Sequence, residues 1–179
     1  MDFRGIKEFI KDIFGYVVVI IAVILIVNYV VTIQQNVGPS MKPTINNGDA
    51  LILNKTAYKL GKVKRNDIIA FLYSGTKYLV KRVVGLPGER IDFKNNVLYI
   101  NGKAYDESFL GDDVVTSDFQ MEDITGCEKG IIPKNSYLVL GDNRTDSMDS
   151  RDIGIVSKKD IIGKTTLRIW PITDFGFVK

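Results

Sequence analysis

The sequence contains no histidine among its 179 residues, and this absence excludes several common kinds of chemistry. Without an imidazole there is no Ser-His-Asp or Cys-His nucleophile system, no His-ligated zinc or haem site, and no ordinary general base near neutral pH. The single cysteine, Cys127, cannot form an internal disulfide or a Cys-x-x-Cys site. Any catalysis must therefore use Ser, Thr, Lys, Asp or Glu side chains.

A strong excess of one charge is also missing. The chain has 24 Lys and Arg against 21 Asp and Glu, which gives a formal net charge of +3. This charge is too small and too dispersed for a nucleic-acid-binding protein, so we expect no nucleic-acid partner. The length fits one globular domain of about 100–200 residues together with an accessory segment.

A long uncharged stretch near the N-terminus predicts a membrane anchor. No charged residue occurs between residues 13 and 41, and residues 14–33 are almost all apolar. At about 1.5 Å per residue, a helix of this length spans the hydrocarbon core of a bilayer. The stretch exceeds the roughly 7–15 apolar residues of a cleavable signal, and no small-x-small cleavage site follows it. We therefore predict a cytoplasmic segment at 1–12 and a retained transmembrane anchor at 13–33.

The basic residues on either side of this anchor predict its orientation. Arg4, Lys7 and Lys11 precede it, whereas only Lys42 lies within about 15 residues after it. The positive-inside rule then places the N-terminus in the cytoplasm. We expect a single-pass protein of type II topology, with residues 34–179 forming an extracytoplasmic domain.

Short β-branched or aromatic runs separated by turn residues predict that this domain is mainly β. The expected strands lie at residues 50–53, 67–73, 78–84, 90–93, 97–100, 136–140 and 166–169. Asn95-Asn96 and Asn101-Gly102 tolerate positive φ, so residues 90–104 are expected to form a meander with two tight turns. Residues 105–130 carry acidic clusters and few paired apolar positions, and we interpret them as a surface insertion.

Two segments contain the residues with the chemistry of a nucleophile and a base. Ser40 lies in a Gly-Pro-Ser-Met-Lys-Pro turn that would expose its hydroxyl and backbone N–H, as acyl transfer requires, although a structural turn serine has the same pattern. Lys81 shares one face of its strand with Leu79 and Val83, where burial would lower its pKa and favour a general base. The alternative is a lysine that reaches solvent or pairs with a carboxylate.

A third segment, residues 141–151, is rich in Asp, Asn, Arg and Ser and must be ordered by hydrogen bonds. Such a loop suits side chains that orient a base or relay a proton. A calcium loop is the competing interpretation, but the oxygen ligands do not fall at alternate positions, and the required Gly and closing Glu are missing. We therefore predict no metal site, while a loop held by surface ion pairs stays open as the alternative.

Taken together, these segments resemble bacterial type I signal peptidases, and in particular their Gram-positive Ser-Lys members. The resemblance rests on an anchor, a Ser-Met pair at residues 40–41, a Lys-Arg pair at 81–82 followed by Val-Val-Gly-Leu-Pro-Gly, and Gly-Asp-Asn-Arg-x-x-Ser-x-Asp-Ser-Arg at 141–151. It implies a membrane-anchored serine endopeptidase with an antiparallel β-sheet domain of signal-peptidase type. Such an enzyme removes N-terminal signal peptides from secreted precursors by cutting after small residues.

The resemblance also implies partners and residue roles. The partners would be secreted preproteins and the lipid bilayer of a bacterial cell, and the chain would act as a monomer near the secretion translocon without a cofactor. Ser40 matches the nucleophile, Lys81 the general base, and Ser147 the serine that orients the lysine. Met41 matches a residue that shapes the substrate pocket. Four positions match residues that hold the site together: Arg82, Asp142, Asp149 and Arg151.

One position departs from part of this family. Some members carry a serine two residues before the nucleophile, and its hydroxyl helps to bind the oxyanion, whereas this chain has Gly38. The oxyanion must then rely on the Ser40 N–H, and the second donor stays open.

Two other functions compete with this interpretation. A self-cleaving Ser-Lys repressor would carry a DNA-binding domain where this chain has its apolar span, and it typically cuts an Ala-Gly bond, which this sequence lacks. The other is an anchored but catalytically silent β module, which the presence of both Ser40 and Lys81 disfavours.

Overall fold

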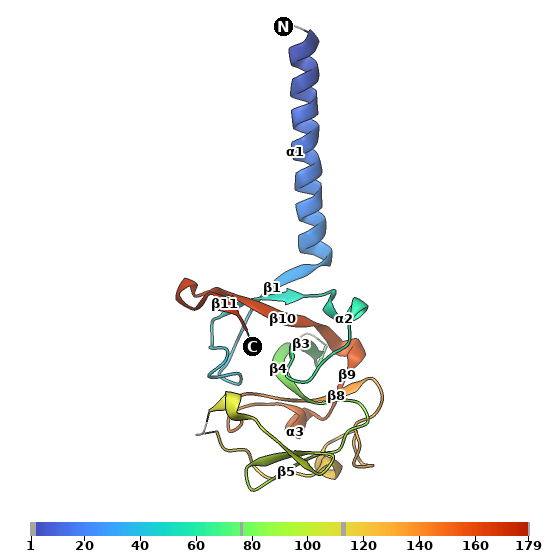
Figure 1. Ribbon diagram of the computed structural model, residues 1–179, viewed down its shortest axis with the longest axis vertical. Coiled ribbons are helices and arrows are strands. Elements are labelled where there is room, and N and C mark those ends of the chain that lie inside the picture. The colour runs from blue at the N-terminus through green and yellow to red at the C-terminus, as the bar shows by residue number, and fades with distance from the viewer. Residues whose placement is uncertain (1–2, 76, 112–113, 179) are drawn as a thin grey trace.

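The computed structural model describes residues 3–75, 77–111 and 114–178 (Figure 1). One long helix, α1 (Phe3–Tyr29), stands apart from a body built of short antiparallel strands. The prediction of a mainly β chain with one long N-terminal helix is therefore confirmed. Parts of three predicted segments lie outside the described residues: 1–2 of the cytoplasmic segment, 112–113 of the insertion, and 76 and 179 of the domain.

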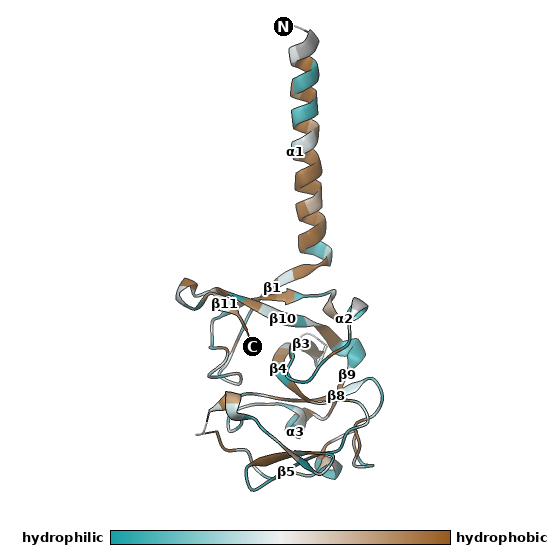
Figure 2. Cartoon of the chain, viewed as in Figure 1, coloured by the Kyte–Doolittle hydropathy of each residue, from teal (hydrophilic) through white to brown (hydrophobic). Residues whose placement is uncertain are grey.

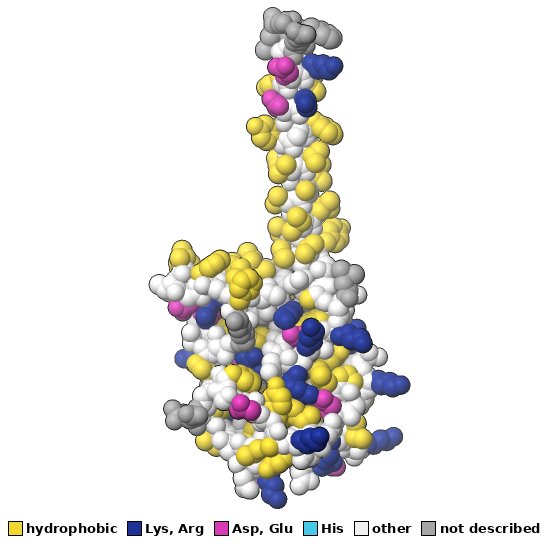
Figure 3. Space-filling view, viewed as in Figure 1, with side chains coloured by type: hydrophobic (Ala, Val, Ile, Leu, Met, Phe, Trp, Pro, Cys, Tyr) yellow, Lys and Arg dark blue, Asp and Glu magenta, His cyan; other side chains and the backbone are white. Residues whose placement is uncertain are grey.

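The helix α1 is apolar around its whole circumference along most of its length (Figure 2). Its charged side chains gather near the N-terminal end (Figure 3), and Gly5–Tyr29 is long and apolar enough to cross a bilayer. The helix ends at Tyr29, whereas the predicted anchor reaches residue 33. Residues 31–35 instead form a strand, because β-branched Val, Thr and Ile favour extended backbone and a second strand is available for pairing.

The body contains two sheets and several short helical turns. The elements are β1 (Val31–Gln35), β2 (Ala50–Asn54), α2 (Ala57–Leu60), β3 (Ile68–Tyr73), β4 (Lys77–Gly85), β5 (Ile91–Lys94), β6 (Val97–Ile100), β7 (Lys103–Tyr105), η1 (Ser108–Leu110), η2 (Met121–Asp123), β8 (Ser136–Leu140), α3 (Ser150–Ile153), β9 (Val156–Ser157), η3 (Lys158–Asp160), β10 (Ile161–Trp170), η4 (Ile172–Asp174) and β11 (Gly176–Phe177). In the described chain the larger sheet has eight strands, ordered β1-β2-β10-β3-β4-β8-β9 with β11 on β10, and the smaller sheet is β5-β6-β7.

Each of the seven predicted strands coincides with an observed one, and the meander is confirmed in detail. Asn95 and Asn96 connect β5 to β6 at φ values of 51° and 62°, and Asn101 and Gly102 connect β6 to β7 at 50° and 77°. These residues occupy the left-handed region that tight hairpin turns require. The third strand of this meander is β7, whereas β1, β9 and β11 were not expected from the sequence.

The segment 105–130 differs from the predicted surface insertion. Phe119, Met121, Ile124 and Cys127 are buried and pack against β5, β6 and β8 in one apolar cluster. Burial raises the pKa of the Cys127 thiol to about 11. The reason for the difference is that apolar residues in irregular chain have no period, so the acidic residues between them dominate the pattern.

The strand order leaves two edges open beside the residues of interest. β4 pairs with β3 from Lys77 to Arg82, but β8 pairs only with Arg82, Val83 and Gly85. The other side of β4 before Arg82 thus has no strand partner in the described chain. β1 lies at the end of the sheet order and pairs only with β2 there. The chain between β1 and β2, residues 36–49, contains Ser40.

Candidate active site

Ser40 lies in a turn-rich loop that is fixed from within. Gly38 has φ +98°, a conformation that favours glycine, and its N–H donates to Asn47 Oδ1 at 2.8 Å. Asp49 is buried and accepts from the Asn46 N–H at 2.9 Å. The Ser40 N–H donates to no acceptor among the described residues. Hydrogen bonds within the loop thus fix the position of Ser40, and the Ser40 N–H can still donate to a ligand.

Lys81 is 2% exposed, so this cation lies almost completely inside the domain. Burial lowers its pKa from 10.5 to about 8, against the smaller opposing effect of the Asp149 and Asp142 carboxylates. Desolvation prevails because each carboxylate is already paired with an arginine. At pH 7 a pKa of about 8 leaves about a tenth of the lysines neutral.

The structure brings Ser40 and Lys81 into direct contact. Lys81 Nζ lies 2.6 Å from Ser40 Oγ, although the residues are 41 positions apart in the sequence. The protonated amine donates this hydrogen bond, and the neutral amine can accept the hydroxyl proton through it. The solvent-reaching alternative for Lys81 is therefore wrong. The pair has the distance that proton transfer between a nucleophile and a general base requires.

A small cavity opens onto this pair between the two open edges. It has a volume of about 60 Å³ and is lined by residues 34–37 on one side, 78–81 on the other, and Ser40. Both walls are extended chain with unused backbone groups, so a peptide strand can add between them. The small volume suits small side chains.

Arg82, which directly follows Lys81 in β4, forms a buried ion pair with Asp142. Arg82 Nε and Nη2 each lie 2.7 Å from a carboxylate oxygen of Asp142, and both side chains are at most 2% exposed. A bidentate pair fixes both position and orientation. It joins β4, directly after Lys81, to the loop 141–151.

Asp149 orders the same loop from its other end. Its carboxylate accepts from the Gly141 N–H at 2.9 Å and from Arg151 Nε and Nη2 at 2.9 and 2.8 Å. Asn143 connects this loop to the serine turn, because its N–H donates to the Ser40 carbonyl at 3.1 Å. All three predicted segments therefore meet at one site.

Ser147 and Met41 lie close to this site without the contacts expected of them. The Ser147 hydroxyl is buried and has no hydrogen-bond partner in the described chain, so it forms no hydrogen bond with Lys81 Nζ. A Cβ on Gly141 would lie 2.1 Å from Ser147 Oγ, which explains the glycine. Met41 is fully buried in an apolar cluster with Val80, which lines the cavity, but Met41 itself is not in that lining.

Sequence reasoning gave no role to two residues that support this loop. Arg144 is 3% exposed, and its guanidinium donates to the Gly141 carbonyl, to Thr116 and to both carboxylate oxygens of Glu107 at 3.0 and 2.6 Å. Glu107 belongs to the segment 105–130, where one acid among several carries no distinguishing signal. Among the described residues there is no cluster of three or more His, Cys, Asp or Glu side chains that could hold a metal ion.

The fold and this geometry are compatible with one class of enzyme. A buried amine in contact with a serine hydroxyl, beside an open sheet edge and in a chain without histidine, has the chemistry that a serine hydrolase needs when lysine replaces histidine as the base.

Comparison with known proteins identifies the family. Residues 6–170 match the family described as "Signal peptidase, peptidase S26". The chain is 45% identical to signal peptidase I of Bacillus caldolyticus over 157 residues, which cover 84% of this chain and 82% of that protein. It is 34% identical to signal peptidase IB of Staphylococcus aureus over 180 residues, which cover 96% of this chain and 94% of that protein. The chain therefore belongs to the peptidase S26 family of signal peptidases.

A solved structure agrees with this assignment. The crystal structure of a signal peptidase I from Enterococcus faecalis is 36% identical and superposes with a TM-score of 0.53, covering 57% of this chain and 96% of that one. The predicted fold type is thus confirmed. Membership of this family also argues against the two alternatives, a self-cleaving repressor and a catalytically silent β module.

Proposed function

We propose that this protein is a membrane-anchored serine endopeptidase that removes N-terminal signal peptides from secreted preproteins, with Ser40 as the nucleophile and Lys81 as the general base. The contact of 2.6 Å between Lys81 Nζ and Ser40 Oγ carries this proposal. Membership of the signal peptidase family and the names of its relatives support the substrate class.

The neutral form of Lys81 begins the reaction. It takes the Ser40 proton while Oγ attacks the carbonyl carbon of the scissile peptide bond. The ammonium then gives this proton to the leaving amine, and the mature protein departs. The acyl-enzyme carries the signal peptide as an ester on Ser40. Lys81 next activates a water molecule that hydrolyses the ester and restores the serine.

Surrounding residues would support these steps. The Ser40 N–H, which no described acceptor occupies, points to one donor of the oxyanion hole. The Gly38 N–H is already used by Asn47, so it is not the second donor. The unpartnered Ser147 hydroxyl would accept a hydrogen bond from the Lys81 ammonium after proton transfer. The Arg82–Asp142 and Asp149–Arg151 ion pairs would hold these groups in position.

The substrate would bind as an added strand in the cleft between residues 34–37 and 78–81. Alternate side chains of a strand point to the same face, so the first and third residues before the cut would face the enzyme together. The cavity of about 60 Å³ beside Ser40 favours small residues such as Ala there.

We also propose that α1 anchors the enzyme in the bacterial cell membrane as a single-pass type II protein with its catalytic domain outside. Lys7 and Lys11 precede the apolar span, as the positive-inside rule requires of a cytoplasmic end. Trp170 and Phe177 are exposed, on the β10–β11 hairpin at the α1 side of the body (Figure 1), where an apolar surface suits lipid. A monomer near the translocon would meet preproteins as they emerge.

The proposal is tested with full-length protein in detergent and a labelled preprotein. The unmodified enzyme should yield one cut at the signal peptide junction. Ser40→Ala and Lys81→Arg should yield none, because the first lacks the nucleophile and the second stays protonated. Circular dichroism controls for folding. Substantial cleavage by either folded variant would refute the assigned dyad.

A further inference from the structure

A second cavity, separate from the substrate cleft, begins two residues after Ser40, at Lys42 and Pro43. We propose that it binds the first residues of the mature chain, and that Lys42 makes it favour acidic residues there. This inference rests on the proposed function, because it concerns the part of the same substrate that follows the cut.

The substrate cleft ends at Ser40 and Lys81. Residues 34–37 run toward Ser40, and β4 runs from Tyr78 to Lys81, so both walls end at the reacting pair. When the scissile carbonyl lies at Ser40, the residues before the cut fill the cleft. The residues after the cut must then continue beyond the pair.

The chain beyond the pair encloses a cavity of about 330 Å³. Its lining comes from Lys42 and Pro43, from Val114 and Val115, and from the loop after β8. The Asn143 N–H bonds the Ser40 carbonyl at 3.1 Å, so this loop and the serine turn are in contact. An extended chain advances about 3.3 Å per residue, and a substrate would therefore bring its second and third mature residues into this space.

The lining has one cation that no other group neutralises. Asp142 is paired with Arg82, and Arg144 with Glu107. The Lys42 side chain is exposed and forms no ion pair with any residue that the structure describes. Its ammonium would attract Asp or Glu of the mature chain and repel Lys or Arg.

The expected effect is moderate, because Lys42 is open to solvent. Exposed ion pairs change equilibria by about two- to fivefold, and salt weakens them. We therefore expect kcat/KM to be about threefold to fivefold higher for a substrate with Asp than for one with Lys at these positions. The ratio should approach one in high salt.

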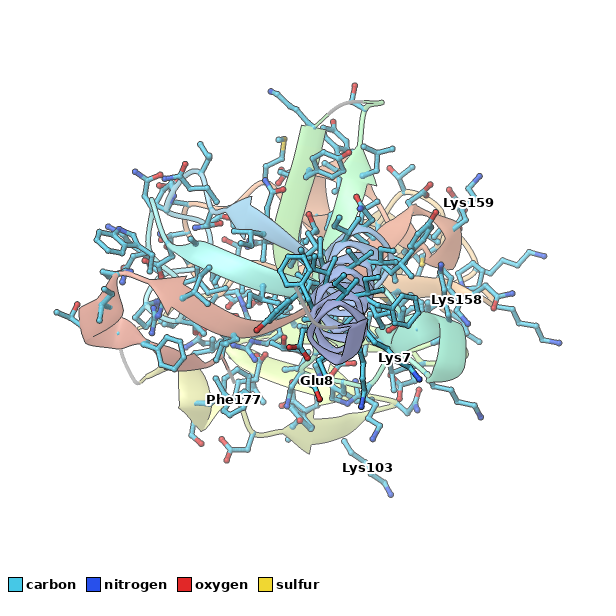
Figure 4. The ribbon with its side chains drawn as sticks, turned by 90° about the horizontal axis from the view of Figure 1, so that it is seen from above. Lys7, Glu8, Lys103, Lys158, Lys159 and Phe177 are labelled. Atoms are coloured by element: carbon cyan, nitrogen blue, oxygen red, sulfur yellow. The ribbon has the colours of Figure 1, made fainter. Side chains whose placement is uncertain are left out.

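The experiment uses three labelled preproteins that are identical except for Ala, Asp or Lys at the second and third residues after the cut. Their kcat/KM values are compared for the unmodified enzyme, Lys42→Ala and Lys42→Glu. The matched control is Lys103→Glu, which makes the same charge change at a lysine that projects into solvent (Figure 4). The Asp-to-Lys ratio should fall to about one in Lys42→Ala, invert in Lys42→Glu and stay unchanged in Lys103→Glu.

Two results would overturn the proposal. A ratio of one in the unmodified enzyme, or the same ratio in Lys42→Glu and Lys103→Glu, removes the acidic preference while cleavage itself continues. Failure of the unmodified enzyme to cut any of the three preproteins instead removes the proposed function, and this subsite with it. The Ala substrate separates these cases, because it carries no charge at the tested positions.

Discussion

Replacing Lys81 with methionine should stabilise the protein at neutral pH while abolishing cleavage. Methionine has nearly the same length as lysine but carries no charge into the interior. The pKa of Lys81 falls from 10.5 to about 8 on folding. At about 1.4 kcal/mol per pH unit, this difference means that holding the protonated amine in the fold costs about 3 kcal/mol.

The lost contact with Ser40 reduces this gain. The hydrogen bond of 2.6 Å disappears in the variant, and an unsatisfied hydroxyl costs about 1 kcal/mol. The net stabilisation is therefore about 2 kcal/mol, which corresponds to a rise in Tm of about 4–8 °C for a domain of this size. Burial is the larger of the two effects, so the sign is a gain.

The pH dependence tests the cause of the gain. Because the folded pKa is the lower one, the unfolded chain binds more protons between pH 8 and 10.5, and the wild type gains stability as the pH rises through this window. The advantage of Lys81→Met should therefore be full at pH 7 and vanish near pH 10.5.

Differential scanning calorimetry in detergent measures this effect at both pH values. The control is Lys77→Met, at an exposed position of the same strand, which should change Tm little at either pH. A lower Tm for Lys81→Met at pH 7, or a gain that persists at pH 10.5, would refute the reasoning.

Three further predictions follow from the same site. Preprotein cleavage should fall about tenfold per unit as the pH drops below about 8, since protonation of Lys81 removes the base, and a pH–rate profile that is flat down to pH 6 would contradict this. Glu107→Gln should lower kcat about tenfold or more at unchanged KM, because it weakens the hold of Glu107 on Arg144 in the loop 141–151. Glu122→Gln, which changes an exposed pair with Arg90, should change neither constant in steady-state assays. Asp142→Asn removes the carboxylate that neutralises buried Arg82 and should reduce the free energy of unfolding by about 3–5 kcal/mol in thermal melts.

The sequence predicts the parts of the fold that have local causes. Alternating β-branched residues specify the strands, and asparagines in the left-handed region specify the turns of the meander. β1 was hidden because its Val and Ile residues continue the apolar run of α1. Residues 31–35 form a strand and not a further helical turn because they pair with β2, and β2 follows later in the chain.

The site itself depends on contacts over long sequence distances. Ser40 and Lys81 are 41 residues apart, so no local pattern shows that they touch, and only the joint presence of three motifs indicated it. Arg82 and Asp142 are 60 residues apart. By contrast, the unpartnered hydroxyl of Ser147 and the complete burial of Met41 depend on packing that motifs do not encode.

The segment 105–130 shows why a site can depend on chain that carries no motif. Its buried Phe119 and Ile124 share an apolar cluster with Leu138 and Leu140 of β8, and the loop 141–151 begins directly after this strand. Glu107 of the same segment then holds Arg144 inside that loop. Packing at one end and an ion pair at the other thus connect this segment to the Ser40 carbonyl through the loop. Changes to the buried core of this segment should therefore reach Ser40 through β8 and the loop 141–151 that follows it.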